Sequence, residues 1–142
     1  METTQHPPQQ ACVCIRLRRI AQKVTEFYDN ALKPAGVSVS QYSLLINIHR
    51  KEGCGTGELA QQVKLEKSTL VRTLQPLIRD GLVTDKSSAK SRQRKLYLTP
   101  LGNDVVKTAL PLWSKAQEEI LSKLKKNHDE LMEIFSHVDS WK

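Results

Sequence analysis

The chain has 142 residues, of which 39% are hydrophobic, and its 22 Lys and Arg outnumber its 15 Asp and Glu, for a net charge of +7. That length fits one domain with its own core, and the positive excess favours a polyanionic partner. No run of about 18 apolar residues is present, so no membrane-spanning helix is expected. Residues 1–10 lack the regions of a signal peptide, and three cysteines are an odd number for a disulfide framework. We therefore expect a cytoplasmic protein with a short flexible N-terminal arm.

Two amphipathic helices are expected first, from Ala11 to about Lys33 and from Ser38 onward. The first has apolar residues at steps of three and four, namely Val13, Leu17, Ile20, Val24, Phe27, Tyr28 and Ala31. Pro34 and Gly36 end it. Ser38, with Gln41 three residues on, forms a capping box for the second helix. The expected inward side chains of that helix are Tyr42, Leu45, Ile46 and His49.

The next segment has the pattern of a helix-turn-helix. Thr56 is expected to cap a short helix whose inward residues are Leu59, Ala60 and Val63. Lys64 and Leu65 make a tight connection, with Leu65 filling the corner. A further helix runs from Glu66 to Asp80 until Gly81 ends it. Its expected inward residues are Leu70, Val71, Leu74, Leu77 and Ile78.

The outward face of the 66–80 helix is polar, and a basic hairpin follows it. The face carries Ser68, Thr69, Arg72, Thr73, Gln75 and Arg79. Such groups suit base edges and phosphates in a major groove, although a merely solvated face would look similar. Two strand-like runs, 82–84 and 95–98, enclose five cations and no acid between residues 86 and 95. A helix-turn-helix beside a hairpin with a cationic tip is a winged helix, whose wing reaches phosphates or the minor groove.

Two further helices are expected after the hairpin. Thr99 and Pro100 begin one that runs to about Lys125, with a kink at Pro111. Its apolar stripe comprises Val105, Val106, Ala109, Leu112, Trp113, Ala116, Ile120 and Leu124. Asn127 restarts a final helix. Its expected inward residues are Leu131, Ile134, Phe135 and Val138.

The fold expected for the single domain 1–142 is mainly α with a small antiparallel β-wing. Helices in 11–33 and 101–141 are more than one small core can cover. We expect them to bury each other across a twofold axis, with 38–99 forming the winged helix-turn-helix lobe. Such a homodimer reads two half-sites about one helical turn apart. The alternative is a monomer whose terminal helices fold back on the lobe.

Two segments resemble the MarR family of bacterial and archaeal transcription regulators: GELAQQVKLEKSTLVRTLQPLIRDGLV (57–83) and KLYLTPLG (95–102). The second is similar to the family's strand-then-LTPxG junction and is the more specific. The resemblance extends from about Ala11 to Trp141. It implies an obligate homodimer with winged lobes on a helical base. It also implies repression by blocking palindromic operators in double-stranded DNA, relieved by a small molecule or by thiol oxidation.

The resemblance also assigns DNA-binding residues. The recognition helix would use Lys67, Ser68, Thr69, Arg72 and Gln75, and the wing tip would use Arg92. The polar face and the basic loop add Thr73, Lys90 and Arg94. The family often has an Asp two residues before the wing arginine to brace it. Lys90 occupies that position here, which predicts a more mobile wing. Pro76 is expected to bend the second half of the recognition helix away from DNA.

Two kinds of switch are predicted. Aligned through SVSQYSLL (38–45), Cys14 matches the peroxide-sensing cysteine of the OhrR branch, and Tyr28 matches a tyrosine that hydrogen-bonds it. Arg18, at the position of that sensor's other tyrosine, offers a cation of the kind that lowers a thiol pKa. The alternative is a buried cysteine acting as a small hydrophobe. Cys12 and Cys14 lie about 200° apart around the expected helix, so a bridge between them is implausible; a bridge to Cys54 or to a partner subunit stays open.

The second switch is a small aromatic effector in a pocket between the first helix, the second helix and the helix from Pro100 to about Lys125. Arg16, Tyr42 and Trp113 would line it, although the two aromatic residues are more often core. No cofactor or metal site is expected, because two cysteines one residue apart with no nearby His do not make a tetrahedral site. No Gly-rich phosphate loop, carboxylate pair or Ser/His/Asp arrangement indicates an enzyme. The rival hypothesis is a non-specific architectural DNA-binding protein.

Overall fold

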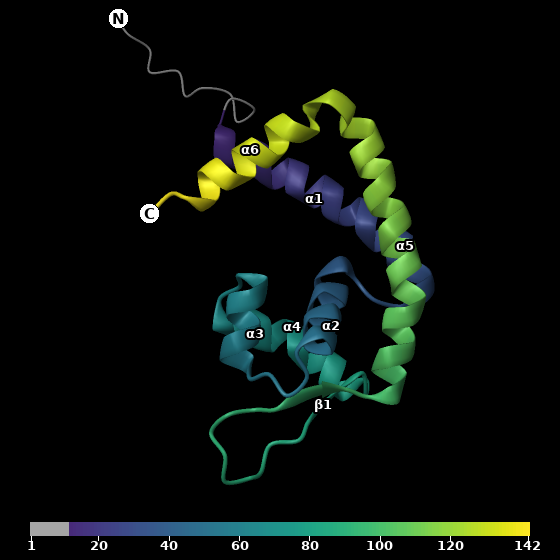
Figure 1. Ribbon diagram of the computed structural model, residues 1–142, viewed down its shortest axis with the longest axis vertical. Helices are drawn as coiled ribbons and strands as arrows, with labels where there is room; N and C mark the ends of the chain where they lie inside the picture. The colour runs from purple at the N-terminus through teal and green to yellow at the C-terminus, as the bar shows by residue number, and fades with distance from the viewer. Residues whose placement is uncertain (1–11) are drawn as a thin grey trace, which may run out of the picture.

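The computed structural model describes residues 12–142, which form a mostly helical molecule with one two-stranded antiparallel sheet (Figure 1). The mainly α fold with a small β-wing is confirmed. The predictions for the N-terminal arm and for a helix start at Ala11 lie outside the described residues. The elements in chain order are α1 (Val13–Leu32), α2 (Val39–Arg50), α3 (Thr56–Val63), α4 (Lys67–Arg79), β1 (Val83–Asp85), β2 (Leu96–Leu98), α5 (Pro100–Leu124) and α6 (His128–Asp139).

The core is centred on α2, α3 and α4. Its most deeply buried side chains are Leu32, Leu44, Leu45, Ile48, Leu59, Leu70, Leu74, Leu77 and Leu96. Burial of each such side chain contributes about 1.5–3 kcal/mol. The prediction that His49 points inward is wrong, because His49 is exposed while Leu44 and Ile48 are buried. The reason is that α2 contacts α1, α3, α4, α5 and β2, so its buried face is wider than one stripe.

Local signals fix the start of α2 and the turn that follows α3. The capping box is confirmed: Ser38 Oγ accepts from the Gln41 N–H at 3.1 Å, and Gln41 Oε1 accepts from the Ser38 N–H at 3.0 Å. By contrast, Thr56 is not a cap, because Gly55 occupies the N-cap position and Thr56 is already helical. Leu65 does not fill the corner, since 37% of its surface is exposed. Lys64 makes the turn with a left-handed backbone, at φ 54°.

The hairpin is joined to the helices at both ends. Val83 pairs with Leu98 and Asp85 with Leu96, and Cys54 forms an isolated antiparallel bridge with Leu96. At the far end, Thr99 Oγ1 accepts from the Gly102 N–H at 3.0 Å. Gly102, in the first turn of α5, lies so close to the segment between α4 and β1 that an added Cβ would be 2.1 Å from the Leu82 carbonyl oxygen. The junction therefore requires glycine.

The terminal helices differ from the core. α5 runs along one side of the molecule, through Pro111, and ends at α6, at the opposite end from the hairpin loop (Figure 1). The first half of α1 exposes its apolar stripe, with Val13 at 72%. On α6, Ile134, Phe135 and Val138 are also exposed rather than buried within the chain. Among the described helices, none combines the length and apolar character needed to cross a bilayer.

Candidate nucleic-acid interface

The recognition helix α4 has one buried and one polar face. Leu70, Leu74 and Leu77 are at most 1% exposed and fix the helix against the core. The opposite face leaves exposed the side chains of Lys67, Ser68, Arg72 and Gln75. Thr69 and Thr73 are half-buried, and the Thr73 hydroxyl donates to the Thr69 carbonyl at 3.1 Å. Thr73 is therefore the one predicted DNA-contacting residue on α4 whose polar group is directed to its own helix. The helix continues past Pro76 to Arg79.

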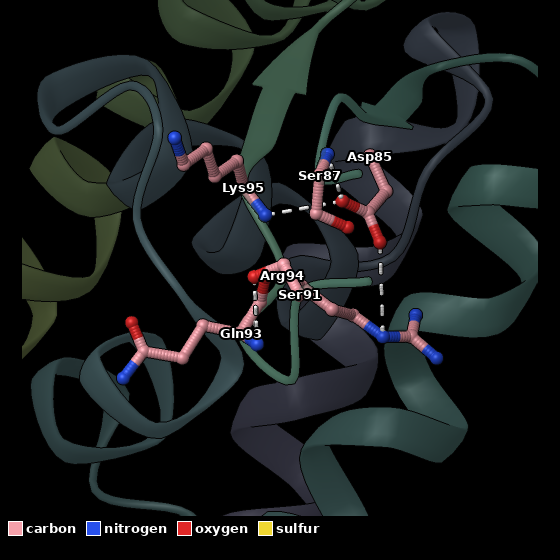
Figure 2. Close-up of polar contacts among 6 residues, drawn as sticks. All are labelled: Asp85, Ser87, Ser91, Gln93, Arg94 and Lys95. Carbon is pink, nitrogen blue, oxygen red and sulfur yellow. Dashed lines mark hydrogen bonds and ion pairs between the residues drawn. The ribbon is translucent and has the colours of Figure 1, made fainter. Parts of the chain in front are cut away.

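The loop between β1 and β2, residues 86–95, projects from the body of the molecule (Figure 1) and carries Lys90, Arg92, Arg94 and Lys95, all exposed. We call this loop the wing loop. Asp85 lies at its base. The Asp85 carboxylate accepts hydrogen bonds from two backbone N–H groups of the loop and faces the Arg94 guanidinium (Figure 2). The tip of the loop has no acid, because Lys90 occupies the position where the family often has an Asp. The prediction of a more mobile wing, however, overlooked Asp85 at the base of the loop.

Burial acts to raise the pKa of the Asp85 carboxyl, but other contacts outweigh it. Hydrogen bonds from Ser87 and from the Lys95 N–H, together with the Arg94 cation, hold that pKa below its ordinary value. The carboxylate is therefore charged at neutral pH. Glu58, at the start of α3, is a second acid whose pKa is lowered, here by a hydrogen bond from Lys51, 2.6 Å away.

A cleft of about 200 Å³ brings the recognition helix and the wing loop together. Its walls include Lys67 from the start of α4 and both Arg92 and Arg94 from the loop, beside Gly55–Glu58 at the start of α3. Three of the predicted DNA-binding cations thus share one hollow with the N-terminal end of a helix, where backbone N–H groups favour anions. Arg72 and Gln75 lie further along α4, and Lys90 lies in the outer part of the loop; none of these three lines the cleft.

The predicted redox residues do not meet within one chain. Cys14 is exposed in the first turn of α1, and Tyr28 lies fourteen residues on, about 21 Å along the helix axis. The Tyr28 hydroxyl instead donates to Gln117 Oε1 on α5. Cys12 is the N-cap of α1 and has an extended backbone, so the helical argument against a Cys12–Cys14 bridge does not apply to it. Cys54 is buried, and burial raises the pKa of its thiol.

The predicted effector residues are also separated. Tyr42 is buried and stacks on Trp113 with ring centroids 6.1 Å apart, which favours their interpretation as core. Asp29 marks the place where α1 meets the start of α2, because its carboxylate accepts a hydrogen bond from the Val39 N–H at 2.8 Å. Arg16 is exposed near the other end of α1, about 20 Å from Asp29 along the helix axis.

A cleft of about 360 Å³ does lie between α1 and α5, but its lining includes none of the predicted residues Arg16, Tyr42 and Trp113. Its lining is Phe27, Asn30, Ala31, Leu112, Lys115, Ala116 and Glu119. The only sequence signal for this cleft is the i,i+4 spacing of apolar residues on the two helices. Within residues 12–142, no three His, Cys, Asp or Glu side chains come together as metal ligands.

A buried helix-turn-helix, a polar recognition helix and a basic wing define a winged helix DNA-binding protein. The model of the MarR family matches residues 37–94. Together with the relatives described next, this match shows that the chain belongs to the MarR family. It is a transcriptional regulator and not an enzyme, as expected.

Known proteins of this type are similar over most of the chain. The HTH-type transcriptional regulator BilQ of Clostridium symbiosum is 26% identical over 113 residues, which are 79% of this chain and 77% of BilQ. The M. tuberculosis transcriptional regulator MosR, solved in complex with DNA, has a TM-score of 0.77 and 30% identity over 91% of this chain and 97% of its own. The repressor CouR, solved bound to p-coumaroyl-CoA, shares the fold with a TM-score of 0.83 at 19% identity, over 99% of this chain and 100% of its own.

Proposed function

We propose that the chain acts as a cytoplasmic homodimeric repressor that binds a pseudo-palindromic operator with α4 of each subunit in successive major grooves. The observation that carries this proposal is the shared cleft of Lys67, Arg92 and Arg94, which puts the recognition helix and the wing on one surface. A groove-bound helix flanked by a basic hairpin matches the geometry of phosphate and base contacts in winged helices. The structure of the similar MosR with DNA supports the same mode.

The proposed contacts follow from exposure along α4 and the wing loop. Arg72 and Gln75 are exposed in the middle of α4 and are assigned to base edges, together with Ser68 and Thr69. Lys67 begins α4 and is assigned to phosphate. Lys90, Arg92 and Arg94 are assigned to phosphates beside the groove.

The proposed dimer base comprises residues 11–33 and 101–141, and 38–99 form the DNA-binding lobe. The support is the apolar surface of α1 and α6 that the described residues 12–142 leave uncovered, where Leu17, Ile20, Ile134 and Phe135 are all exposed. Contiguous apolar surface of this kind marks an association site. A second copy placed there buries both helices and sets two reading surfaces at a fixed spacing.

The test is a binding titration on an operator selected from random DNA, compared with scrambled DNA. A repressor should prefer its operator by about 10³ or more. Arg72→Ala should reduce that preference, since one bidentate contact is worth about 1–3 kcal/mol. Arg92→Ala should weaken all sequences about equally, and Lys126→Ala, a matched charge loss at the α5–α6 turn, should change little. Equal affinity for all DNA with a steep salt slope would support the architectural alternative.

We further propose release from DNA through the dimer base, by oxidation of Cys14 or by a small aromatic ligand. Because Tyr28 is about 21 Å from Cys14 along α1, a Cys14–Tyr28 contact requires the partner's α1. A hydroperoxide would oxidise the Cys14 thiolate to a sulfenic acid and leave as the alcohol. Peroxide should release wild-type protein but not Cys14→Ser. Retained sensitivity in that variant would exclude Cys14 as the sensor. The ligand would bind at the dimer base rather than to Arg16, Tyr42 and Trp113 together, because one chain keeps Arg16 apart from the two aromatic residues. The solved complex of CouR with p-coumaroyl-CoA supports testing acyl-aromatic ligands.

A further inference from the structure

Asp85 is the last residue of β1 and the only acid between Gly81 and Thr99. One oxygen of its carboxylate, Oδ1, accepts from the Ser87 N–H at 2.9 Å and from the Lys95 N–H at 3.0 Å. These two N–H groups belong to opposite ends of the wing loop. Below them, the Lys86 N–H donates to the Lys95 carbonyl at 2.8 Å. A single carboxylate therefore closes the base of the loop (Figure 2).

The other carboxylate oxygen, Oδ2, lies 3.9 Å from Arg94 Nε. The Asp85 side chain is 25% exposed and the Arg94 side chain 43%, so this pair is partly shielded from solvent. Arg94 also lines the cleft that contains Lys67 of α4 and Arg92. The Asp85 carboxylate therefore stands between the base of the loop and an arginine that lines the cleft beside the recognition helix.

The outer part of the loop is ordered by a serine. Ser91 Oγ accepts from the Gln93 N–H at 3.2 Å, and the Ser91 N–H donates to the Ser88 carbonyl at 3.0 Å. These bonds fix the backbone on either side of Arg92. Arg92 therefore lies in an ordered part of the loop whose base Asp85 closes.

Judged by its charge alone, Asp85 would weaken DNA binding. A carboxylate beside five cations of a DNA-binding loop reduces the attraction to phosphates. An acid that only lowered the net charge would weaken DNA binding, and its removal would strengthen it. An acid that holds the cations in position has the reverse effect, because displaced cations no longer reach their phosphates.

We propose that Asp85 is the positioning residue of the wing: it closes the loop base and directs Arg94 and Arg92 toward the DNA. The inference rests on the proposed phosphate contacts of the wing. The acid that braces the wing would then lie at the end of β1, because Lys90 occupies the loop position where the family often has an Asp. Asp85 itself touches no DNA; it acts through the two arginines.

The test compares Asp85→Ala with Asp80→Ala, a matched loss of one exposed acid at the end of α4. Asp85→Ala should weaken operator binding about tenfold although the net charge rises by one, and should lower the salt slope by about one for the lost phosphate contact. Asp80→Ala should bind as tightly as wild type or more tightly. Asp85→Asn, which keeps an acceptor but loses the ion pair, should fall between wild type and Asp85→Ala.

Two measurements distinguish the loss of the positioning role of Asp85 from a general destabilisation of the fold. Hydrogen exchange of the Ser87 and Lys95 amides should accelerate in Asp85→Ala while amides in α2 and α4 keep wild-type protection. In an Arg94→Ala background, the same Asp85 substitution should cost less than in wild type. If Asp85→Ala does not fold, the same measurements on Asp85→Asn decide the question.

Unchanged or tighter operator binding by a folded Asp85 variant would overturn the proposal. If Arg92→Ala and Arg94→Ala also bind like wild type, the proposed phosphate contacts of the wing fail instead. If those two variants weaken binding and Asp85→Ala does not, only the positioning role fails.

Discussion

The DNA-binding lobe, residues 38–99, and the outer helices, comprising the first half of α1 and all of α6, carry the same kind of apolar stripe with opposite results. In the lobe, Leu74 is 1% exposed, whereas on α6 Phe135 is 51% exposed. The lobe buries its stripes among its own three helices and hairpin, with further cover from α5 and the end of α1. The outer helices find no such cover within residues 12–142. An apolar stripe therefore shows which face of a helix requires burial but not which chain supplies the cover.

The largest effect is expected from charges placed in the exposed apolar face of α6, which a second copy would cover. Ile134→Asp combined with Phe135→Asp should raise the dimer dissociation constant about 100-fold or more, because central apolar interface residues contribute about 2–4 kcal/mol each. Analytical ultracentrifugation measures the change. Ser136→Asp, which adds a charge to another face of α6, should remain dimeric. Wild-type protein that stays monomeric at micromolar concentration would refute the dimer base directly.

The next effect tests the lobe. Leu74→Ala should destabilise the protein by about 2–5 kcal/mol, since it leaves a cavity at the centre of the lobe. Urea unfolding at a fixed protein concentration measures the loss. Leu101→Ala removes the same atoms from an exposed site on α5 and should change stability by about 0.5 kcal/mol or less. Similar losses for both would mean that the lobe is not packed as described.

A smaller effect is expected where the lobe joins α5. Gly102→Ala should cost about 1–3 kcal/mol, because its Cβ would lie 2.1 Å from the Leu82 carbonyl oxygen and the backbone must shift. Gly57→Ala is the matched control: nothing lies within 4 Å of its Cβ position. It should stabilise the protein by about 0.4–1 kcal/mol. Thermal unfolding of the two variants should therefore shift in opposite directions.

The smallest expected effect is the pH dependence of the wing. The pKa of Asp85 is lower in the folded protein than in the unfolded chain, where it is about 3.9. The contribution of its carboxylate to the free energy of unfolding is therefore complete above the unfolded-state pKa and is lost as the pH falls through the folded-state pKa. Between pH 6 and 8 the amide resonance of Lys95 should not change. Below about pH 4 it should shift as the carboxyl protonates. A transition at neutral pH would rule out Asp85 as its source.

Local features of the sequence predicted most of the fold. The Ser38–Gln41 capping box and the Thr99–Gly102 helix start depend on neighbouring residues, and both are observed. Contacts between distant residues were harder to predict. Leu44 and Ile48 were missed because the width of a buried face depends on how many elements surround the helix.

The candidate site divides in the same way. The polar face of α4 follows from helical periodicity, and the wing cations follow from composition. The Asp85 brace was missed because it joins residues ten apart through hairpin geometry. The roles proposed for Cys14 and Tyr28 depend on a second chain, which no pattern within one sequence specifies.

The close approach of Gly102 to Leu82 has a mechanical consequence. With the backbone of α5 in contact with the lobe there, α5 has no clearance to slide along the lobe. A conformational change at the far end of α5 must therefore reach the lobe by bending of the helix. Pro111 is its softest point, because the Lys107 carbonyl lacks the N–H partner that every ordinary residue would provide.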